Sequence, residues 1–344
     1  MTTIRRQLEE DEARVLSPLA ALSSQSRGRV RPEPECDLRP AFQHDRDRIL
    51  HSKAFRRLKH KSQVFLSPTG DHYRTRLTHT LEVSQIARTM AKSLRLNQDL
   101  TEAIALGHDL GHTPFGHAGE AVLNEIVEDG FRHNEQSLRV VDVLEDLNLT
   151  QEVRDGILKH SKGQDRGIIS TDEDAPLTLE GLVVRVADIT AYICHDIDDA
   201  IRAGVLTVSD LPADCLEAVG RSHSERIGRM VRDLVFTTLD RDDGRLHLSP
   251  NMTQAMGELR DFLYQQVYGN PAIRDDLDRA ERILAALFVA VVEDPEGEEY
   301  RQALEQRKGE DLILAAVDFV AGMTDRYALS LYDKLFLPRP WAVL

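Results

Sequence analysis

Two histidines and two carboxylates stand in sequence contexts that favour a divalent-metal site. His79 lies on an apolar helical stripe, His108 and Asp109 are consecutive, and Asp188 is flanked by apolar residues. A buried carboxylate is costly unless it is paired or bound to a metal. Two imidazoles and two carboxylates would form a neutral site around a divalent cation, with positions open for water and substrate. The alternatives are an ordinary core histidine at position 79 and an ion pair between Asp188 and Arg185.

A second pair of ionisable residues follows the His-Asp dipeptide at helical spacing. His117 and Glu120 are three residues apart and would share one helix face. A carboxylate beside an imidazole can fix its tautomer and raise its basicity, as in hydrolytic dyads. The alternative is an ordinary contact on a helix surface.

Histidines and positive charges are concentrated in the same part of the chain. Nine of the thirteen histidines lie between His44 and His133. The whole chain has 43 Lys and Arg against 58 Asp and Glu, for a net charge of −15, which argues against a surface built to bind nucleic acid. Residues 46–76 reverse this balance with a surplus of seven positive charges, directly before His79. This run is either a solvated face or local compensation for an anionic ligand.

The elements that must position these residues are predicted to be helices. Aromatic residues make up only 5%, and apolar residues recur with helical periodicity, so the predicted fold class is all-α. We expect helices over 1–16, 79–94, 99–108, 113–127, 134–147, 179–203, 221–236, 251–267, 272–292, 298–304 and 310–335. Residues 239–249 are predicted to form a small β-hairpin that turns at Asp243 and Gly244. The expected organisation is an N-terminal arm (1–45), a catalytic core (46–210) and a C-terminal helical part packed on the core (211–344).

Targeting signals are missing from this sequence. It contains no apolar run of about 18 residues and no secretory leader, and its three cysteines are too few for a disulfide framework. We therefore expect a cytoplasmic protein with no membrane partner.

Several long motifs together resemble one enzyme family. RTRLTHTLEVSQIAR (74–88), GHDLGHTPFGHAGE (107–120), HNEQSLR (133–139) and ADITAYICHDIDDA (187–200) are similar to the deoxyguanosinetriphosphate triphosphohydrolase family of the HD superfamily. HSKAFRRLKHKSQVF (51–65) resembles the segment that precedes the first metal histidine of that family. The likeness covers roughly residues 40–205, and the chain length resembles the shorter bacterial subgroup. The fold implied is an HD-domain helical bundle.

This resemblance implies a role for each matching residue. The metal ligands would be His79, His108, Asp109 and Asp188, and the catalytic pair would be His117 and Glu120. Arg76 resembles a phosphate-contacting arginine, and we expect His112 and His133 to donate to phosphate rather than to bind the metal.

Sugar recognition is expected on the helix that carries Asp188. Tyr192 and Asp196 follow Asp188 at i+4 and i+8, so all three share one face. The family counterpart of Tyr192 packs where a 2′-hydroxyl would lie, and that of Asp196 accepts from the 3′-hydroxyl. Gln63 resembles a residue that also contacts the 3′-hydroxyl. The alternative for Tyr192 is a core aromatic residue.

The predicted function is metal-dependent hydrolysis of a deoxynucleoside triphosphate, dGTP or several dNTPs, to deoxynucleoside and triphosphate. Mg²⁺ or Mn²⁺ is expected as the metal, and Fe²⁺ or Co²⁺ is compatible with two histidine ligands. Relatives are oligomers, so we expect a homo-oligomer that uses the C-terminal helices ending at residues 336–341, with a nucleotide or single-stranded DNA as an effector. The alternatives are an HD hydrolase of nucleoside monophosphates or signalling nucleotides, and a non-catalytic nucleic-acid binder that uses FRRLKHK (55–61).

Overall fold

The described part of the chain folds into helices joined by turns and by longer irregular segments, such as residues 16–40 between the first two α-helices. The computed structural model describes residues 3–63, 74–161, 167–169, 174–306, 309 and 311–338. These residues contain no β-strand, and their only bridges are the isolated pairs Arg29–Thr150 and Ser62–Thr75. The predicted all-α class is therefore confirmed. No helix among the described residues is long and apolar enough to cross a membrane.

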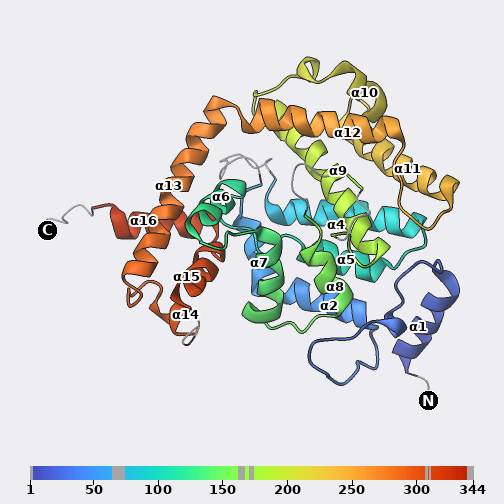
Figure 1. Cartoon of the computed structure of the whole chain (residues 1–344), viewed down its shortest axis with the longest axis horizontal. Coiled ribbons are helices and arrows are strands. Elements are labelled where there is room, and N and C mark those ends of the chain that lie inside the picture. The colour runs from blue at the N-terminus through green and yellow to red at the C-terminus, as the bar shows by residue number, and fades with distance from the viewer. Residues whose placement is uncertain are drawn as a thin grey trace, which may run out of the picture.

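The helices follow one another along the whole described chain, as Figure 1 shows. Their bounds are α1 Ile4–Val15, α2 Ala41–His51, α3 Lys53–Arg57, α4 Arg76–Ser93, α5 Gln98–Gly107, α6 His117–Ile126, α7 His133–Arg139, α8 Gln151–Leu158, α9 Leu179–Arg202, α10 Ala213–Val219, α11 His223–Arg241, α12 Pro250–Leu263, α13 Pro271–Glu293, α14 Arg301–Glu305, α15 Leu312–Ala321 and α16 Asp325–Phe336. Two π-helical turns, η3 Val140–Leu144 and η5 Tyr264–Tyr268, extend α7 and α12.

A large hydrophobic core surrounds the packed helices α4, α5 and α9. Helix α4 begins after Thr75, whose side chain forms a reciprocal capping box with Thr78. Its stripe of Val83, Ile86 and Met90 is almost fully buried. Burial of each such side chain contributes roughly 1.5–3 kcal/mol, so this face fixes the orientation of the helix.

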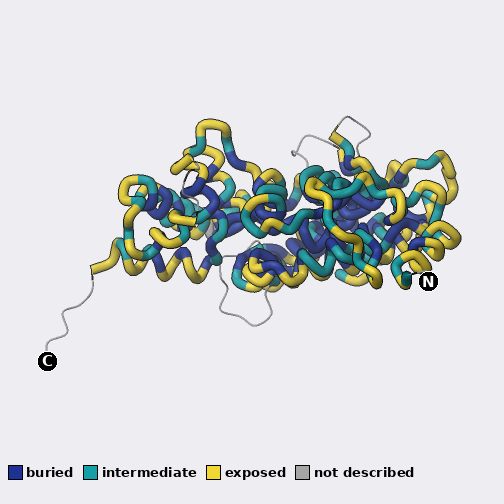
Figure 2. Tube along the Cα trace, turned by 90° about the horizontal axis from the view of Figure 1, so that it is seen from below, coloured by how far each residue is buried: buried dark blue, intermediate teal, exposed yellow. Residues whose placement is uncertain are grey.

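A second hydrophobic core is formed by α6 together with the C-terminal helices. Phe115 and Leu123 pack there with Leu284 of α13, Val320 of α15 and Leu331 of α16. In Figure 1, α13 to α16 lie to the left of the α4–α5–α9 group, and α6 and α7 lie between the two. Buried stretches of the chain occur in both halves of Figure 2. Helix α6 therefore packs with the C-terminal helices, although it follows α5 directly in sequence.

The predicted hairpin at 239–249 is wrong. Leu239 and Asp240 belong to α11, which continues to Arg241 and ends at Asp242 in a left-handed conformation. The helix begins with a capping box between Ser222 and Glu225 and buries Met230 and Leu234, so helical packing extends beyond the predicted boundary. The residues after Gly244 have no strand partner among the described residues.

Three predicted helix boundaries also change. The helix expected from Thr113 starts at His117, because Phe115 and Gly116 have positive φ angles of 62° and 59°. The N-cap of α5 is Asn97, which accepts from the backbone N–H of Leu100, and not Asp99. The helix expected over 310–335 is interrupted after Ala321 and restarts at Asp325, behind the N-cap Thr324.

The expected apolar end of the chain is only partly described. Phe336 and Leu337 are exposed, and residues 339–344 lie outside the described residues.

Candidate active site

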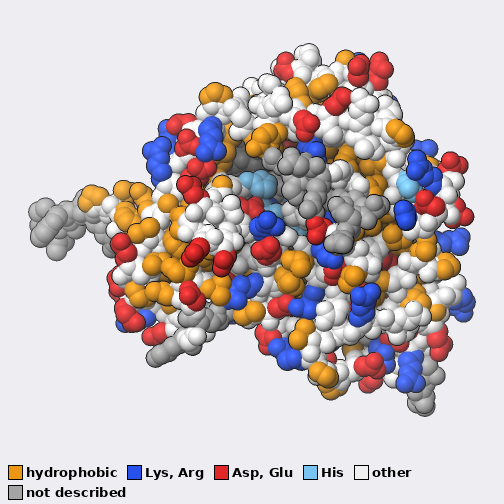
Figure 3. Space-filling model, viewed as in Figure 1, with side chains coloured by type: hydrophobic (Ala, Val, Ile, Leu, Met, Phe, Trp, Pro, Cys, Tyr) orange, Lys and Arg blue, Asp and Glu red, His pale blue; other side chains and the backbone are white. Residues whose placement is uncertain are grey.

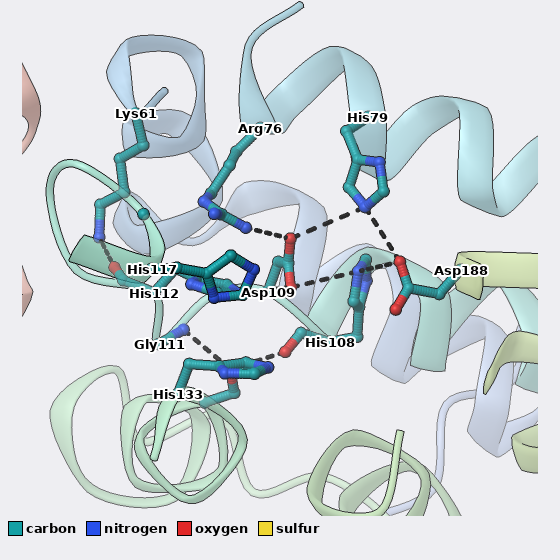
Figure 4. A network of polar contacts seen from close by, with 12 residues as sticks. Lys61, Arg76, His79, His108, Asp109, Gly111, His112, His117, His133 and Asp188 are labelled. Carbon is teal, nitrogen blue, oxygen red and sulfur yellow. Dashed lines mark hydrogen bonds and ion pairs between the residues drawn. The ribbon is translucent and has the colours of Figure 1, made fainter. Parts of the chain in front are cut away.

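The four residues expected to bind a metal come together from three helices of the large core. Helix α4 supplies His79, the end of α5 leads into His108 and Asp109, and α9 supplies Asp188 (Figure 4). His79 Nε2 lies 3.1 Å from Asp188 Oδ1 and 3.9 Å from Asp109 Oδ2. His108 Nε2 lies 3.3 Å from Asp109 Oδ1 and 3.8 Å from Asp188 Oδ1. His79, His108 and Asp109 form one compact group, and Asp188 faces its two histidines.

The donor set of this cluster fits a divalent cation. His108 Nδ1 lies 2.7 Å from the carbonyl oxygen of Ala105, so Nδ1 carries the proton and Nε2 keeps its lone pair. That Nε2 is buried and has no hydrogen-bond partner among the described residues. His79, His108 and Asp109 offer ligand atoms that all lie within 4.8 Å of one another. Burial alone would raise the pKa of Asp109, but His108, His112 and Arg76 lower it well below its usual value, so it is a carboxylate.

The ion pair considered as an alternative for Asp188 does not form. Arg185 instead donates to the carbonyl oxygens of Lys159 and Asp174. The carboxylate of Asp188 faces His79 and His108. Although burial opposes ionisation, the hydrogen bond with His79 lowers the pKa of Asp188.

Among the described residues of the basic segment, Arg76 is the cation that reaches this cluster. Arg76 is 2% exposed, and its Nη1 donates to Asp109 Oδ2 at 2.8 Å. Its Nε and Nη2 are buried and have no partner in the described part of the chain. Other basic residues of the segment pair elsewhere: Arg46 with Asp99, Arg48 with Glu33, and Arg74 with Glu82, Asp198 and Asp199. Residues 64–73 of this segment lie outside the described residues.

The segment FRRLKHK (55–61) is only partly exposed, with Arg56, Arg57 and Lys59 at the surface. Phe55, Leu58 and Lys61 are buried. Lys61 Nζ donates to the carbonyl oxygens of His112 and Ala321. Burial and the nearby guanidinium of Arg76 lower the pKa of Lys61 to about 7. This lysine therefore connects the active-site turn to α15.

The turn after Asp109 needs glycine for close packing. Gly111 donates its backbone N–H to the Ser137 hydroxyl at 2.8 Å, and that hydroxyl donates to the His108 carbonyl oxygen at 2.7 Å. A Cβ at position 111 would lie 2.1 Å from the backbone nitrogen of Ser137. The turn is thereby packed directly against α7.

The expected catalytic pair stands at the start of α6. His117 Nδ1 lies 3.4 Å from Glu120 Oε2, and the His117 side chain is 74% exposed. Glu120 also accepts from the backbone N–H of His133 at 2.9 Å and contacts His133 Nδ1 at 2.8 Å. Burial alone would raise the pKa of Glu120, but its contacts with His117 and His133 hold it far below its usual range. Glu120 is therefore ionised and orients two imidazoles.

His112 and His133 lie together between this pair and the metal-ligand cluster. Their rings stack with centroids 4.0 Å apart. His112 Nε2 lies 3.2 Å from Asp109 Oδ1, and burial lowers the pKa of His112 well below its usual value. Asp109, His112 and His133 also offer ligand atoms within 4.8 Å of one another. Histidine side chains line a hollow in the face shown in Figure 3.

Two histidines of this site were not anticipated from the sequence. His160 Nε2 lies 3.2 Å from His133 Nε2 and 4.0 Å from Asp109 Oδ1, and burial lowers the pKa of His160 to about 3. His195 Nδ1 lies 3.3 Å from His79 Nδ1. The spacing of seven residues between Asp188 and His195, two helical turns, could have indicated the second contact.

Two of the residues expected at the sugar, Tyr192 and Asp196, follow Asp188 on α9, whereas Gln63 lies beside Gly116. Asp196 is 2% exposed, and its Oδ2 accepts a hydrogen bond from the hydroxyl of Tyr268, another residue that the sequence did not single out. Asp196 Oδ1 and Gln63 Oε1 are buried acceptors without a donor among the described residues. Burial raises the pKa of Asp196 to about 7. Tyr192 is half-buried and packs against the large core.

Comparison with known proteins identifies two matching family models. Residues 76–193 match the HD domain, and residues 246–334 match the phosphohydrolase-associated domain. The first match contains all four residues expected to bind a metal, and the second contains Tyr268 and most of the second core.

Curated relatives match along the whole chain. A deoxyguanosinetriphosphate triphosphohydrolase-like protein of Caldanaerobacter subterraneus subsp. tengcongensis is 53% identical, over 98% of this chain and 97% of the relative. Proteins of the same name from Desulfatibacillum aliphaticivorans and Clostridium perfringens are 51% and 46% identical, over 98% of this chain and 99% and 98% of the relatives.

Proposed function

This chain belongs to the deoxyguanosinetriphosphate triphosphohydrolase-like family of HD phosphohydrolases, and on that premise we propose that it hydrolyses deoxynucleoside triphosphates to deoxynucleoside and triphosphate. We further propose Mg²⁺ or Mn²⁺ as the working metal, held by His79, His108, Asp109 and Asp188. The names of the relatives support the substrate class, and the histidine–carboxylate cluster supports the metal.

One observation carries the proposal: buried polar atoms without partners surround the cluster. On one side Arg76 has free donors at Nε and Nη2, which suit phosphate oxygens. On the α9 side, Asp196 Oδ1 is an acceptor without a donor among the described residues, which suits a hydroxyl group. Gln63 Oε1 is a second such acceptor, and Gln63 lies beside Gly116 and Arg76. Buried polar atoms in native proteins are nearly always satisfied, so this set favours a ligand with anionic and hydroxyl-bearing parts. A deoxynucleoside triphosphate has both.

In the proposed reaction, water attacks the α-phosphorus and the bond from that phosphorus to the 5′ oxygen breaks. A bound divalent metal would polarise an α-phosphate oxygen and lower the pKa of a bound water. Arg76 would donate to phosphate oxygens and offset their charge. His117, oriented by the ionised Glu120, would handle the proton transferred at the α-phosphate. His133 would donate to the polyphosphate from the same side. His112 does not suit the donor role expected of it, because burial lowers its pKa and its single N–H, at Nε2, faces Asp109.

Selectivity for deoxyribose is proposed for the α9 side of the site. Asp196 would accept from the 3′-hydroxyl, and Tyr192 would occupy the space that a 2′-hydroxyl requires. A site that is built to hydrogen-bond one hydroxyl discriminates strongly against substrates that lack it, because its buried polar groups then stay unpaired.

The direct test is product analysis with the purified chain. Each of the four dNTPs is incubated with Mn²⁺ or Mg²⁺, and the products are separated by ion-exchange chromatography. We expect deoxynucleoside and tripolyphosphate in equal amounts. Formation of dNMP and pyrophosphate, or no turnover of any dNTP, would contradict the proposal, and turnover of dNMP alone would favour a different HD hydrolase.

A matched histidine variant controls for nonspecific effects. His247 contacts Asp243 at 2.8 Å in the turn after α11 and has no role in the proposed site. We expect His247→Ala to retain wild-type product formation, whereas His117→Ala loses most of it.

A further inference from the structure

We propose that Asp325, at the start of α16, is a positioning residue that holds the loop directly before His117 (residues 113–116) in place relative to the metal-ligand cluster. The effect that we expect on turnover rests on the proposed function. Its structural part can be measured without any substrate.

Asp325 is a buried carboxylate whose two oxygens bond two distant segments. It is 2% exposed although it begins a helix in the C-terminal part. Its Oδ1 accepts from the backbone N–H of Phe115 at 3.0 Å. Its Oδ2 accepts from the backbone N–H of Ser62 at 2.9 Å and from the Ser62 hydroxyl. One side chain of α16 therefore contacts Phe115, which is 210 positions earlier in the chain, and Ser62, which is 263 positions earlier.

The bond to Phe115 acts where the backbone is strained. Phe115 has a φ of +62°, a conformation that bulky residues rarely adopt, and Gly116 has a φ of +59°. Strained backbone persists only where the surrounding structure determines it. His117 follows directly as the first residue of α6. The hydrogen bond from the N–H of Phe115 to Asp325 therefore helps to set the direction in which α6 begins.

The bond to Ser62 fixes a second segment of the chain, which packs beside Gly116. Ser62 forms an isolated bridge with Thr75, the N-cap of α4, and the Lys61 carbonyl oxygen accepts from the backbone N–H of Arg76 at 3.0 Å. Arg76 contacts Asp109, and His79 lies one turn later on α4. Gln63 is the next residue after Ser62. The carboxylate of Asp325 therefore fixes the loop before His117 and the start of α4 relative to each other.

A side chain with two acceptor oxygens suits this position. Both oxygens face donors, so an asparagine would place its NH₂ group against the N–H of Phe115 or of Ser62. Proton transfer and phosphate positioning depend on sub-ångström placement, and a misplacement of about 1 Å can cost about 10²-fold in rate. We therefore infer that Asp325 acts on turnover through the placement of His117.

The test compares Asp325→Asn with the full-length wild-type chain. Hydrogen exchange followed by mass spectrometry should show faster exchange in peptides covering residues 110–118, and unchanged exchange in α5 and α9. Mn²⁺ binding should stay within about threefold of wild type, because no metal ligand changes. With dNTP, kcat should fall about 10- to 100-fold, whereas KM should stay within about threefold.

Asp318→Asn is the matched control. Asp318 is also a buried carboxylate of the C-terminal part, but it pairs with Arg139 at 2.7 Å and with Gln136 at 2.9 Å, not with the loop. We expect it to lower the melting temperature as much as Asp325→Asn does and to leave kcat within about threefold. A double variant adds a second readout: in a His117→Ala background, Asp325→Asn should lower kcat no further, because residues that act as a unit are non-additive.

Unchanged exchange at 110–118 in Asp325→Asn would overturn the inference, whatever the substrate proves to be. Equal losses of kcat in Asp325→Asn and Asp318→Asn, or additive losses with His117→Ala, would also overturn it by indicating a general effect on stability. If the wild-type chain turns over no dNTP, the proposed function fails, while the exchange measurement still decides whether Asp325 holds the loop.

Discussion

The metal-ligand cluster and the expected catalytic pair are built in different ways. His79, His108 and Asp109 are almost completely buried and extend from helices that share the large core. His117 is 74% exposed and begins α6, whose apolar face belongs to the second core with α13, α15 and α16. The boundary between the two cores therefore passes through the site, between Asp109 and His117.

This difference matches the two tasks proposed for the site, which are to hold a metal and to transfer a proton. A rigid, buried set of ligands can keep its geometry before substrate arrives. The catalytic pair is joined to that set by a short turn with two residues at positive φ and by polar contacts from the C-terminal part. We therefore expect substitutions in the two regions to produce different combinations of lost metal, lost turnover and lost selectivity.

The largest effect is expected from Asp109→Ala in the buried cluster. This change removes a ligand and leaves the buried Arg76 guanidinium without its carboxylate partner. Metal binding measured by isothermal titration should become undetectable. Turnover should fall by on the order of 10³-fold or more, as expected when several kcal/mol of metal-derived stabilisation is lost. Retention of both properties would contradict the assignment of the cluster.

His117→Ala should separate turnover from metal binding. The side chain is exposed and lies outside the cluster, so Mn²⁺ affinity should remain within about threefold of wild type. Loss of a general acid or base should lower kcat by about 10²- to 10⁴-fold. Both quantities can be measured on one preparation, by titration and by product analysis. Loss of the metal in this variant would show that the two regions are not independent.

Tyr268→Phe should weaken sugar selectivity, with little effect on metal binding or on the turnover of dNTP. It removes the hydroxyl that donates to Asp196 Oδ2 and leaves the ring in place. A hydrogen bond to a charged group contributes about 1.5–3 kcal/mol, so the preference for dNTP over the 3′-deoxy analogue, measured as a ratio of kcat/KM, should fall by about tenfold or more.

Tyr264→Phe is the control for that change. Tyr264 is 53% exposed and contacts the ring of Tyr268. Its hydroxyl has no role in the proposed site, so selectivity should stay at the wild-type value. An equal loss in both variants would indicate a packing effect instead of a contact with Asp196.

The smallest effect is expected in the pH dependence of the free energy of unfolding, through the ionisation of Asp196 on α9. Burial raises the pKa of Asp196 to about 7, above its value in the unfolded chain, so the folded state binds this proton more tightly. The free energy of unfolding of the metal-free protein should therefore increase as pH falls from 8 to 6, by about 1.4 kcal/mol from this group. In Asp196→Asn this contribution should disappear, which denaturant titrations of both proteins at the two pH values would measure. Identical pH dependence in the two proteins would contradict the raised pKa.

Much of the helical organisation could be predicted from local patterns. The stripe of Val83, Ile86 and Met90 predicted α4, and helices were expected close to the observed bounds of α9 and α13. Errors occurred where a local signal competed with the backbone. Thr113 and Pro114 look like a helix start, but the positive φ angles of Phe115 and Gly116 delay the helix to His117. Asp243 and Gly244 look like a hairpin turn, but the described part of the chain contains no strand that could pair there.

Part of the chemistry of the site could also be predicted from local sequence patterns. The order of His79, His108, Asp109 and Asp188 indicated a metal cluster, because residue type and helical face are properties of the sequence. His160, Tyr268 and Asp325 were not anticipated, since nothing in their local sequence states which distant group each contacts.

The sequence by itself determined most of the longer helices, the apolar stripe of α4 and the residue types that can bind a metal or move a proton, whereas α2, α3, α8 and α10 were not predicted. Helical periodicity and capping act over a few residues and are therefore visible in a single chain. Only the tertiary structure decided that α6 packs with the C-terminal helices, that Tyr268 contacts Asp196, and that Asp325 contacts Phe115. These contacts join residues 72 or more positions apart, and they depend on how whole helices pack against one another, which no local pattern specifies.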